Sequence, residues 1–301
     1  MGIAVRIIAM VNQKGGCGKT TTAINTAAAL AERSKRILLV DLDPQAHATI
    51  GLGYDPESFH HTIYDVLRSS NGRLSSVAVH TKIEGLDLAP CNVLLAGAEM
   101  ELSQGSDRQL RLTEGLRPAR DIYDVCIIDC PPSLGVLTFN ALVACTEILV
   151  PVQVHYYALE GLKRLLETVR IIRERYHPDS MERVGLLLTF VEEHSAFSRQ
   201  IQQEMRDLFG DLVYDSVIHR NARLTESPSA GESVLTYASQ SRGAADYRAL
   251  ACELLGETSK APEPISEGLR RGIQKHLVTL FEGVWIPRAA HSYDTGTIES
   301  T

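Results

Sequence analysis

Short, nearly continuous apolar runs recur along the chain. In order, they are VRIIAMV, RILLVDLD, YDVCIIDCPP, TEILVPVQV, ERVGLLLTFV and DLVYDSVI. These runs are rich in Val, Ile and Leu and show little alternation with polar residues, which is typical of strands buried on both faces of a sheet. We therefore expect each run to form a strand of one mostly parallel sheet.

Longer segments with helical spacing separate these runs, at residues 20–33, 158–176 and 196–209. In the second segment apolar residues recur at intervals of three and four, namely Leu159, Leu162, Leu166, Val169, Ile172 and Tyr176. The alternation predicts an α/β fold: a mostly parallel sheet covered by helices on both faces, with ligands at the carboxyl ends of the strands. No linker interrupts it before residue 257, so we expect one domain over residues 1–257 and a tail over 258–301.

The composition is that of an ordinary globular chain, with 301 residues, 44% hydrophobic and 22% charged. The N-terminus lacks the basic region and the cleavage site of a signal peptide, and Arg6 departs from the myristoylation pattern. The six cysteines occur singly, without the paired spacings of zinc sites or disulfide scaffolds, which favours the reduced cytoplasm. Because the net charge is -7, any contact with nucleic acid needs a local basic patch.

The stretch VNQKGGCGKTTTAIN follows the first apolar run and ends as the phosphate-binding pattern G-x-x-x-x-G-K-[ST] does, although Gln13 stands where the pattern begins with glycine. Its glycines are Gly15, Gly16 and Gly18. Glycines let backbone N–H groups turn toward phosphate oxygens at the start of the next helix. The pattern assigns Lys19 to the β- and γ-phosphates and Thr20 to Mg²⁺. With a strand before it and a helix after it, this loop is better explained by nucleotide binding than by a purely structural turn.

Acidic residues follow two of the predicted strands, at the edge where a parallel sheet places its active site. Asp41 and Asp43 lie at the end of the run LLVDLD, and Asp129 ends CIID. Phosphoryl transfer needs a carboxylate near Mg²⁺ and a group that orients the attacking water. A single acid after a strand is commonly a cap of the next turn or helix. Acids after two strands, beside a phosphate loop, favour a catalytic site.

The segment KGGCGKTTTAIN resembles the deviant Walker A motif of the ParA/MinD family of partition and positioning ATPases, which have the P-loop NTPase fold. In that family the early lysine, here Lys14, crosses an ATP-sandwiched dimer interface and touches the phosphates bound by the other subunit. The resemblance implies an ATPase that uses ATP and Mg²⁺, with Lys14 acting in trans and Lys19 in cis, so that hydrolysis depends on dimerisation. It assigns nucleotide contacts to Lys14, Gly15, Gly16, Cys17, Gly18, Lys19, Thr20 and Thr21.

The resemblance also assigns roles to the three acids. Asp129 matches the Walker B residue, and Asp43 matches the residue that positions the attacking water. Asp41 is expected to support the metal shell, to which Thr20 and Asp129 contribute. The expected catalytic set is Lys14, Lys19, Asp43 and Asp129.

Stretches outside the catalytic motifs resemble ParA rather than MinD sequences, over residues 4–256 in all: LAPCNVLLAGAEMEL, ILVPVQVHYYALEGL, HRNARLTESPSAG and SRGAADYRALACEL. This likeness implies a homodimer with ATP, associated with the nucleoid through non-specific DNA binding, and a ParB-like partner that stimulates hydrolysis. The chain begins at the strand of the phosphate loop, so the helix-turn-helix of large plasmid-type ParA proteins is not expected. Sequence-specific operator binding is not expected either.

The family's DNA contacts lie late in the domain. Arg223 in RNARL matches one such position, and Arg220 and Arg199 are expected to join it in contacting phosphates. Further candidates are Arg206, Arg242 and Arg248. Two departures weaken the match: His194 stands, beside two glutamates, where the family often has arginine, and His219 replaces a proline near the adenine. The alternative for Arg223 is a surface salt bridge or a residue at a helix start.

Three other functions remain open. An iron-sulfur ATPase of the nitrogenase iron-protein kind shares the loop, and Cys91, Cys126 and Cys130 are its candidate ligands, although buried structural cysteines explain them better. A positioning ATPase for a protein organelle or a chemoreceptor cluster has the same chemistry as ParA. A MinD-like membrane-cycling ATPase requires a basic amphipathic helix near the C-terminus.

The tail offers one amphipathic pattern. Apolar residues at helical spacing are Ile265, Leu269, Ile273, Leu277, Leu280, Phe281 and Val284, and Pro287 ends the pattern. Between 265 and 285 the charges are three basic and two acidic residues, a net +1, which attracts anionic lipid only weakly. We expect this helix to pack on its own domain or on a partner protein rather than on a membrane.

Overall fold

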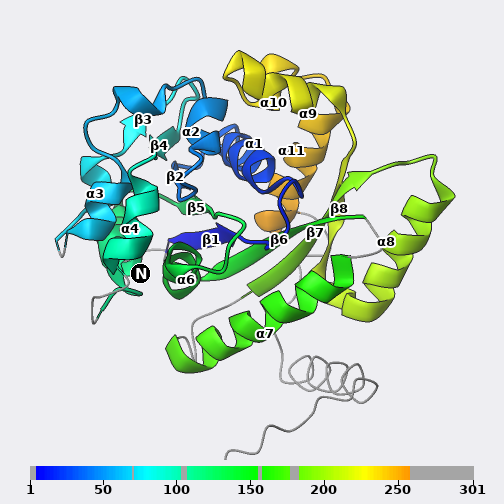
Figure 1. The fold of residues 1–301 in the computed structure, drawn as a ribbon. Coiled ribbons are helices and arrows are strands. Elements are labelled where there is room, and N and C mark those ends of the chain that lie inside the picture. Colours follow the sequence, from blue (N-terminus) through cyan, green and yellow to red (C-terminus); the bar gives the residue numbers. More distant parts are fainter. Residues whose placement is uncertain (1–4, 70, 103–106, 155–157, 177–182, 258–301) are drawn as a thin grey trace, which may run out of the picture. The chain divides into compact units, whose positions relative to one another are not determined.

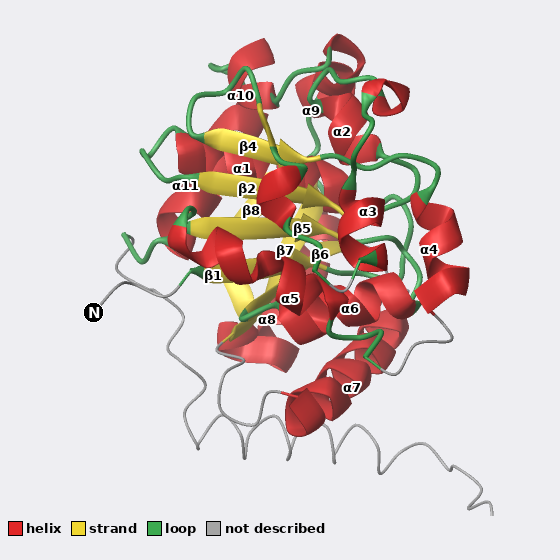
Figure 2. Ribbon diagram, turned by 90° about the vertical axis from the view of Figure 1, so that its left-hand side faces the viewer, coloured by secondary structure: helices red, strands yellow, loops and turns green. Residues whose placement is uncertain are grey.

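The computed structural model describes residues 5–69, 71–102, 107–154, 158–176 and 183–257. In these residues strands and helices alternate around one eight-stranded sheet (Figures 1 and 2). The strands are β1 (Arg6–Met10), β2 (Ile37–Asp41), β3 (Val79–His80), β4 (Leu86–Ala89), β5 (Val125–Asp129), β6 (Glu147–Gln153), β7 (Arg183–Val191) and β8 (Val213–His219). The sheet therefore forms from strands spread along the whole described chain.

The sheet has the order β3-β4-β2-β5-β1-β6-β7-β8, and only the β3–β4 pair is antiparallel. The strand β1 lies between β5 and β6, so the chain leaves the centre of the sheet first toward one edge and later toward the other. In the register, Asp129 of β5 lies beside Met10 of β1 on one side and beside Asp41 of β2 on the other. This arrangement brings the loop after β1 next to both acids, at a topological switch point.

Helices cover both faces of this sheet (Figure 1). They are α1 (Lys19–Ala31), α2 (His47–Gly51), α3 (Ile63–Arg68), α4 (Leu95–Leu102), α5 (Arg111–Leu116), α6 (Val136–Ala144), α7 (Ala158–Tyr176), α8 (Ala196–Phe209), α9 (Ala222–Glu226), α10 (Val234–Tyr237) and α11 (Arg242–Leu254). Short 3₁₀ turns are Pro56–Ser58, Leu74–Ser76, Arg117–Asp121, Gly210–Leu212 and Ser227–Ala230. One hydrophobic core cluster lies between the sheet and α1 and α11. The small buried residues Ala23, Ala27 and Ala28 let α1 pack closely there.

The predicted fold class is confirmed, and so are the strands and helices predicted from the apolar pattern. The runs predicted as strands are β1, β2, β5, β6, β7 and β8, and the segments 158–176 and 196–209 are α7 and α8. In α7 the buried residues include Leu165, whereas the predicted Leu166 is partly exposed. Two strands were missed, because β3 has two residues and β4 has four, too few to show a period.

The tail and the predicted amphipathic helix lie outside the described residues, so the helix and the domain boundary at residue 257 stay predictions. Among the helices that the structure describes, none has both the length and the apolar character needed to cross a membrane.

Candidate nucleotide-binding site

The loop between β1 and α1 has the geometry of an anion site. Gly16 and Gly18 have φ values of 72° and 91°, in the left-handed region that glycine adopts without strain. Gly18 is also the N-cap of α1, and no side chain caps this helix end. The first N–H groups of α1 are therefore available to a ligand, at the positive end of the helix dipole.

The side chains of the two loop lysines, Lys14 and Lys19, lie in different surroundings. Lys19 is only 7% exposed, and its Nζ donates a hydrogen bond to the carbonyl oxygen of Lys14 over 3.2 Å. The side chain of Lys14 is exposed instead, and its Nζ donates to Gln153 Oε1 on β6 over 3.0 Å. Asn12 anchors the start of the loop. Its Nδ2 donates to the Pro151 carbonyl oxygen over 2.7 Å, and its Oδ1 accepts from the Lys14 N–H. One lysine thus lies inside the loop and the other faces outward.

The two strand-end acids Asp41 and Asp129 are both fully buried but differ in their partners. Asp41 Oδ2 accepts hydrogen bonds from the Thr49 N–H at 2.8 Å and from the Thr49 hydroxyl at 2.7 Å, and Oδ1 accepts from the Asp43 N–H at 3.3 Å. Neither carboxylate oxygen of Asp129 accepts a hydrogen bond from a described residue. Asp41 is therefore satisfied within the protein, whereas Asp129 is not.

Burial disfavours the charged form of both acids. Burial raises the pKa of Asp41 to about 6, against the opposing effect of its Thr49 hydrogen bonds. Burial and the neighbouring charge of Asp41 raise the pKa of Asp129 well above the usual range, and the nearby Thr20 hydroxyl and Lys19 only partly oppose this rise. A nearby cation would reverse these shifts, so the pair fits a site that holds positive charge.

Asp129 and Thr20 have the chemistry expected of magnesium ligands. A fully buried carboxylate without a hydrogen-bond partner is rare, and a bound cation is one of its explanations. Among the described residues no group of three or more His, Cys, Asp or Glu side chains is arranged to hold a metal ion. Magnesium at nucleotide sites takes one or two protein oxygens and completes its shell with phosphate and water. The residues present fit that pattern.

Asp43 lies just beyond the end of β2, at the same edge of the sheet. It is nearly buried, and its Oδ1 accepts a hydrogen bond from the Gln45 N–H over 3.0 Å, as aspartates in tight turns do. The Cys91 thiol donates to the Asp43 carbonyl oxygen over 3.2 Å. These contacts fix the turn that carries Asp43.

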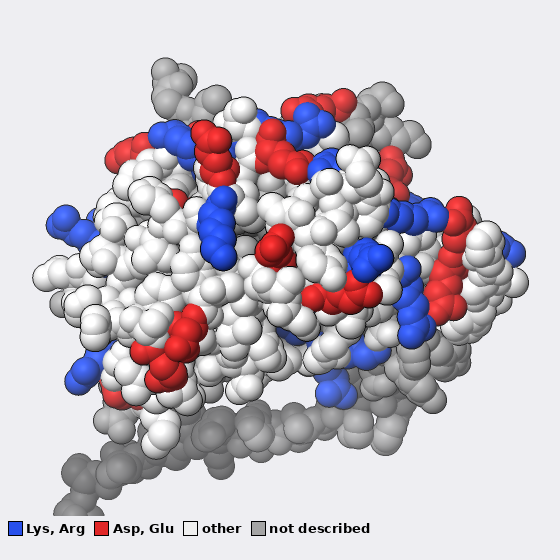
Figure 3. All heavy atoms as spheres, turned by 90° about the horizontal axis from the view of Figure 1, so that it is seen from above, with Lys and Arg blue, Asp and Glu red and all other residues white. Residues whose placement is uncertain are grey.

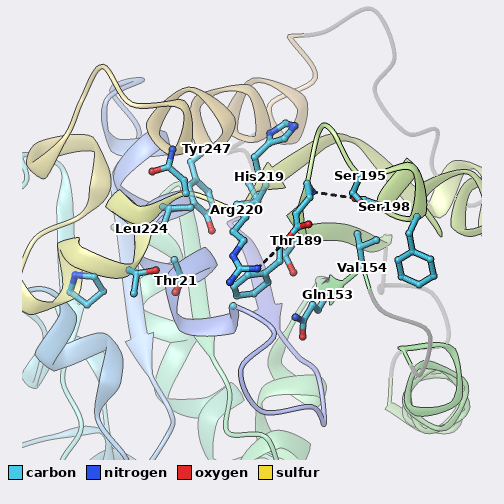
Figure 4. A pocket seen from close by; sticks show the side chains of 18 residues that line it. Thr21, Gln153, Val154, Thr189, Ser195, Ser198, His219, Arg220, Leu224 and Tyr247 are labelled. Carbon is cyan, nitrogen blue, oxygen red and sulfur yellow. Dashed lines mark hydrogen bonds and ion pairs between the residues drawn. The ribbon is translucent and has the colours of Figure 1, made fainter. Parts of the chain in front are cut away.

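A cavity of about 730 Å³ opens beside the loop and lies against Gly18 and Thr21 (Figure 4). The ends of β6, β7 and β8, the starts of α8 and α9, and α11 form its walls. The Thr189 hydroxyl of β7 donates to the Cys17 carbonyl oxygen over 2.9 Å, which ties this wall to the phosphate loop. The volume lies within the range of small-molecule pockets, so it has room for the nucleoside of a bound nucleotide.

His219, which replaces the family's proline, lies in the cavity wall but is fully engaged there. Its Nδ1 lies 3.0 Å from Asp246 Oδ2, and Arg242 donates to its Nε2 over 2.9 Å. Both ring nitrogens of His219 thus have a partner within hydrogen-bond distance. His219 therefore joins β8 to α11 rather than offering a free ring nitrogen to a base.

The sequence pattern gave no indication of this cavity, because its walls come from loops far apart in the chain. Arg220, predicted as a DNA contact, extends into it, and its NH1 pairs with Glu192 Oε1 at 2.9 Å (Figure 4). Only the parallel order β6-β7-β8 brings these loops together. The aspartates that follow β2 and β5 indicated the acidic part of the site from the sequence. No comparable sequence pattern marks the residues that line the cavity.

The arginines predicted to contact DNA all have acidic or carbonyl partners. Arg223 on α9 pairs with Glu226 at 2.6 Å, and Arg199 on α8 donates to the Glu193 carbonyl oxygen over 2.9 Å. The further candidates are likewise engaged: Arg206 with Asp215, Arg242 with Glu193 and Arg248 with Glu32. On the face in Figure 3, basic and acidic side chains are interspersed. Each of these arginines is therefore at least partly compensated within one subunit.

The cysteines predicted to be structural are buried and free. Cys91, Cys126 and Cys130 all lie in the interior, and burial raises the pKa of the Cys126 thiol to about 12. Burial likewise raises the pKa of Cys130 well above its usual range. Iron-sulfur ligation requires thiolates, which these surroundings disfavour.

Comparisons with known proteins agree with this geometry. The family model described as AAA domain matches residues 5–181. The sporulation initiation inhibitor protein Soj of Bacillus subtilis (strain 168) is 45% identical over 249 residues, which cover 83% of this chain and 98% of Soj. The chromosome partitioning protein ParA of Myxococcus xanthus is 44% identical over 259 residues, covering 85% of this chain and 90% of that protein.

A solved structure is also similar to this chain. It is that of a Mycobacterium smegmatis protein named cobyrinic acid a,c-diamide synthase, with bound ADP and magnesium. Its TM-score with this chain is 0.74 at 34% identity, and the match covers 87% of this chain and 99% of the other.

Proposed function

The chain belongs to the ParA/MinD family of P-loop ATPases, and we propose that it is a ParA-type partition ATPase. In this proposal two copies dimerise with ATP, bind DNA non-specifically and drive the partitioning of chromosome, plasmid or other cargo. A ParB-like partner stimulates hydrolysis. The observation that carries the proposal is the divergence of the two loop lysines, one buried in its own phosphate site and one exposed.

Lys19 and the start of α1 bind the phosphates of the subunit's own nucleotide. In the structure the Lys19 ammonium donates to the Lys14 carbonyl oxygen, so a phosphate oxygen is a stronger replacement acceptor at the same place. Thr20 and Asp129 would hold magnesium, which when bound neutralises charge on the phosphate oxygens during phosphoryl transfer. Asp41 keeps α2 in place through Thr49 and supports the site electrostatically. Asp43 orients the attacking water.

Lys14 completes the site of the other subunit. Its exposed ammonium has one neutral acceptor, Gln153, and loses little when it moves to a phosphate of a facing copy. A second lysine at the phosphates stabilises the charge of the transition state, as an arginine finger does. Hydrolysis then depends on dimerisation, which is what a nucleotide-controlled switch requires.

DNA binding in this proposal depends on the dimer. Arg223 is exposed and lies at the start of α9, on the segment that also lines the nucleotide cavity. In one subunit Glu226 balances its charge, so a phosphate must compete with that carboxylate. Two copies of Arg199 and Arg223 in a dimer double the number of phosphate contacts and favour DNA binding by the ATP-bound form. The expected location is the nucleoid in the cytoplasm.

The test is the specific ATPase activity of the purified chain as a function of its own concentration, with and without non-specific duplex DNA. A dimer-dependent enzyme becomes more active per molecule as its concentration rises. We expect slow hydrolysis that rises in this way and increases further with DNA and a ParB-like partner. A specific activity that is independent of concentration contradicts the proposal.

A further inference from the structure

Large apolar side chains are exposed to solvent at the start of α4. On the inward side, Leu95, Ala98 and Leu102 are buried. On the outward side, Val93 and Leu94, which lead into the helix, are 63% and 56% exposed. Exposed apolar side chains that lie together are typical of a surface that another molecule covers.

Gly97 in the middle of α4 supports this interpretation independently. A Cβ atom at this position would meet nothing within 4 Å, so no packing inside the subunit requires glycine. Its φ is not in the left-handed region, so the backbone does not require glycine either. Glycine inside a helix is less favourable than alanine. A close approach by another surface explains its presence.

This face lies at the edge of the sheet that carries the phosphate site. In Figure 2, α4 lies on the side toward which the strand arrows point. The loop before α4 is attached to the catalytic edge, because the Cys91 N–H donates to Thr49 Oγ1 over 3.1 Å and its thiol donates to the Asp43 carbonyl oxygen. Between β4 and β1 lie only β2 and β5, a separation of about 14 Å at normal strand spacing.

We propose that Val93, Leu94 and Gly97 form part of the contact between two copies of this chain in the ATP-bound dimer. This inference rests on the proposed function, since Lys14 reaches a second site only if the carboxyl edges of two copies meet. A contact of standard size covers about 800 Å² on each partner, roughly 30 Å across, and so spans both Lys14 and α4. Around a two-fold axis each contact occurs twice, so both copies bury these apolar side chains.

The charges of this segment disfavour nucleic acid and anionic lipid as its occupants. Residues 91–102 contain no lysine or arginine, so nucleic acid and anionic lipid are not attracted. Glu101 is already paired with Arg68 of α3 at 3.2 Å. An uncharged centre with polar residues at its margin is typical of the core of a protein interface.

Leu94→Glu tests the proposal by placing a carboxylate in the apolar contact of each copy. The matched control is Ile171→Glu, because Ile171 on α7 is also apolar and is 57% exposed. Light scattering with a non-hydrolysable ATP analogue gives the dimer dissociation constant. We expect Leu94→Glu to raise it at least about tenfold and Ile171→Glu to leave it unchanged. Both variants should bind a fluorescent ATP analogue as the wild type does.

A second variant, Gly97→Arg, places bulk where the two copies are proposed to approach most closely, and it should also abolish the dimer. If both Leu94→Glu and Gly97→Arg dimerise as the wild type does, the inference is overturned. It is also overturned if Leu94→Glu dimerises normally but loses stimulation by a second protein, since the face then serves that protein. A wild-type chain that stays monomeric with the analogue contradicts the proposed function itself.

Discussion

Asp41 and Asp129 are register partners on adjacent parallel strands, yet Asp41 accepts three hydrogen bonds and Asp129 accepts none from the described residues. Both carboxylates are fully buried. The Thr49 hydrogen bonds tie Asp41 to α2, whereas both oxygens of Asp129 are without a hydrogen-bond partner among the described residues. This difference separates two acids that the sequence pattern presents alike.

The first prediction concerns the stability of the nucleotide-free protein. Burial raises the pKa of Asp129, so its protonated form is favoured in the folded state and its ionised form is destabilising. As pH rises through the raised pKa, the wild type loses stability relative to Asp129→Asn, which carries no charge at any pH. Urea unfolding between about pH 5 and pH 8 measures this difference.

The matched control for that measurement is Asp121→Asn, since Asp121 is exposed and its removal leaves no buried charge behind. The stability difference between wild type and Asp129→Asn should widen with pH, whereas the difference for Asp121→Asn should stay constant. Parallel profiles for both variants contradict the assignment of an unpaired buried carboxylate.

The second prediction separates the roles of the two lysines in binding. Lys19→Ala removes a buried cation from the phosphate site, and ATP affinity should fall by roughly tenfold to a hundredfold, the worth of one hydrogen bond to a charged group. Lys14→Ala should keep the affinity of the single subunit within about threefold, because its side chain faces outward. Titration with a fluorescent ATP analogue at low protein concentration gives both values. Equal losses in the two variants would show that both lysines act within one subunit.

The third prediction concerns Asp43. Its place beyond the end of β2 lets it orient water without holding the nucleotide, so Asp43→Ala should bind ATP but hydrolyse it at least about a hundredfold more slowly. The variant should accumulate as an ATP-bound dimer that stays on DNA. Single-turnover hydrolysis and light scattering check the two parts. Hydrolysis at the wild-type rate would remove Asp43 from the mechanism.

The fourth prediction concerns DNA. Arg223→Glu should abolish ATP-dependent binding to non-specific duplex while the dimer persists, because a phosphate contact adds affinity without reading sequence. Arg170→Glu on α7 is the control, since Arg170 is also an exposed helical arginine with a glutamate partner. The milder variant Arg223→Ala, which removes the charge without reversing it, should lower the slope of log affinity against log salt by about one for each subunit. An unchanged slope refutes the phosphate contact.

Strong local patterns predicted the central part of the fold. Runs such as CIID and ILVPVQ are apolar on both faces, and this decides both their strand character and their burial. The same pattern predicts the acids, because parallel strands bring Asp41 and Asp129 to one edge whatever lies between them. The strand β4 was missed because LDLA is too short to distinguish a strand from a loop.

The rest of the site depends on long-range packing. The difference between Asp41 and Asp129 arises from Thr49, which reaches Asp41 only because α2 turns back over the strand. Arg220 extends into the nucleotide cavity because Glu192, 28 residues earlier, lies across from it. Neither relation has a periodic signature in the sequence, so neither was predictable from it.

Trans-complementation tests the central claim, that Lys14 acts on the nucleotide of the other subunit, most directly. Lys14→Ala keeps Asp43 but cannot serve its neighbour, whereas Asp43→Ala can serve its neighbour but cannot hydrolyse its own ATP. Each variant alone should be nearly inactive. An equimolar mixture should recover about a quarter of the wild-type ATPase rate, since about half of randomly formed dimers are mixed and each has one complete site. A mixture that stays as inactive as its components shows that Lys14 acts within its own subunit and contradicts the account.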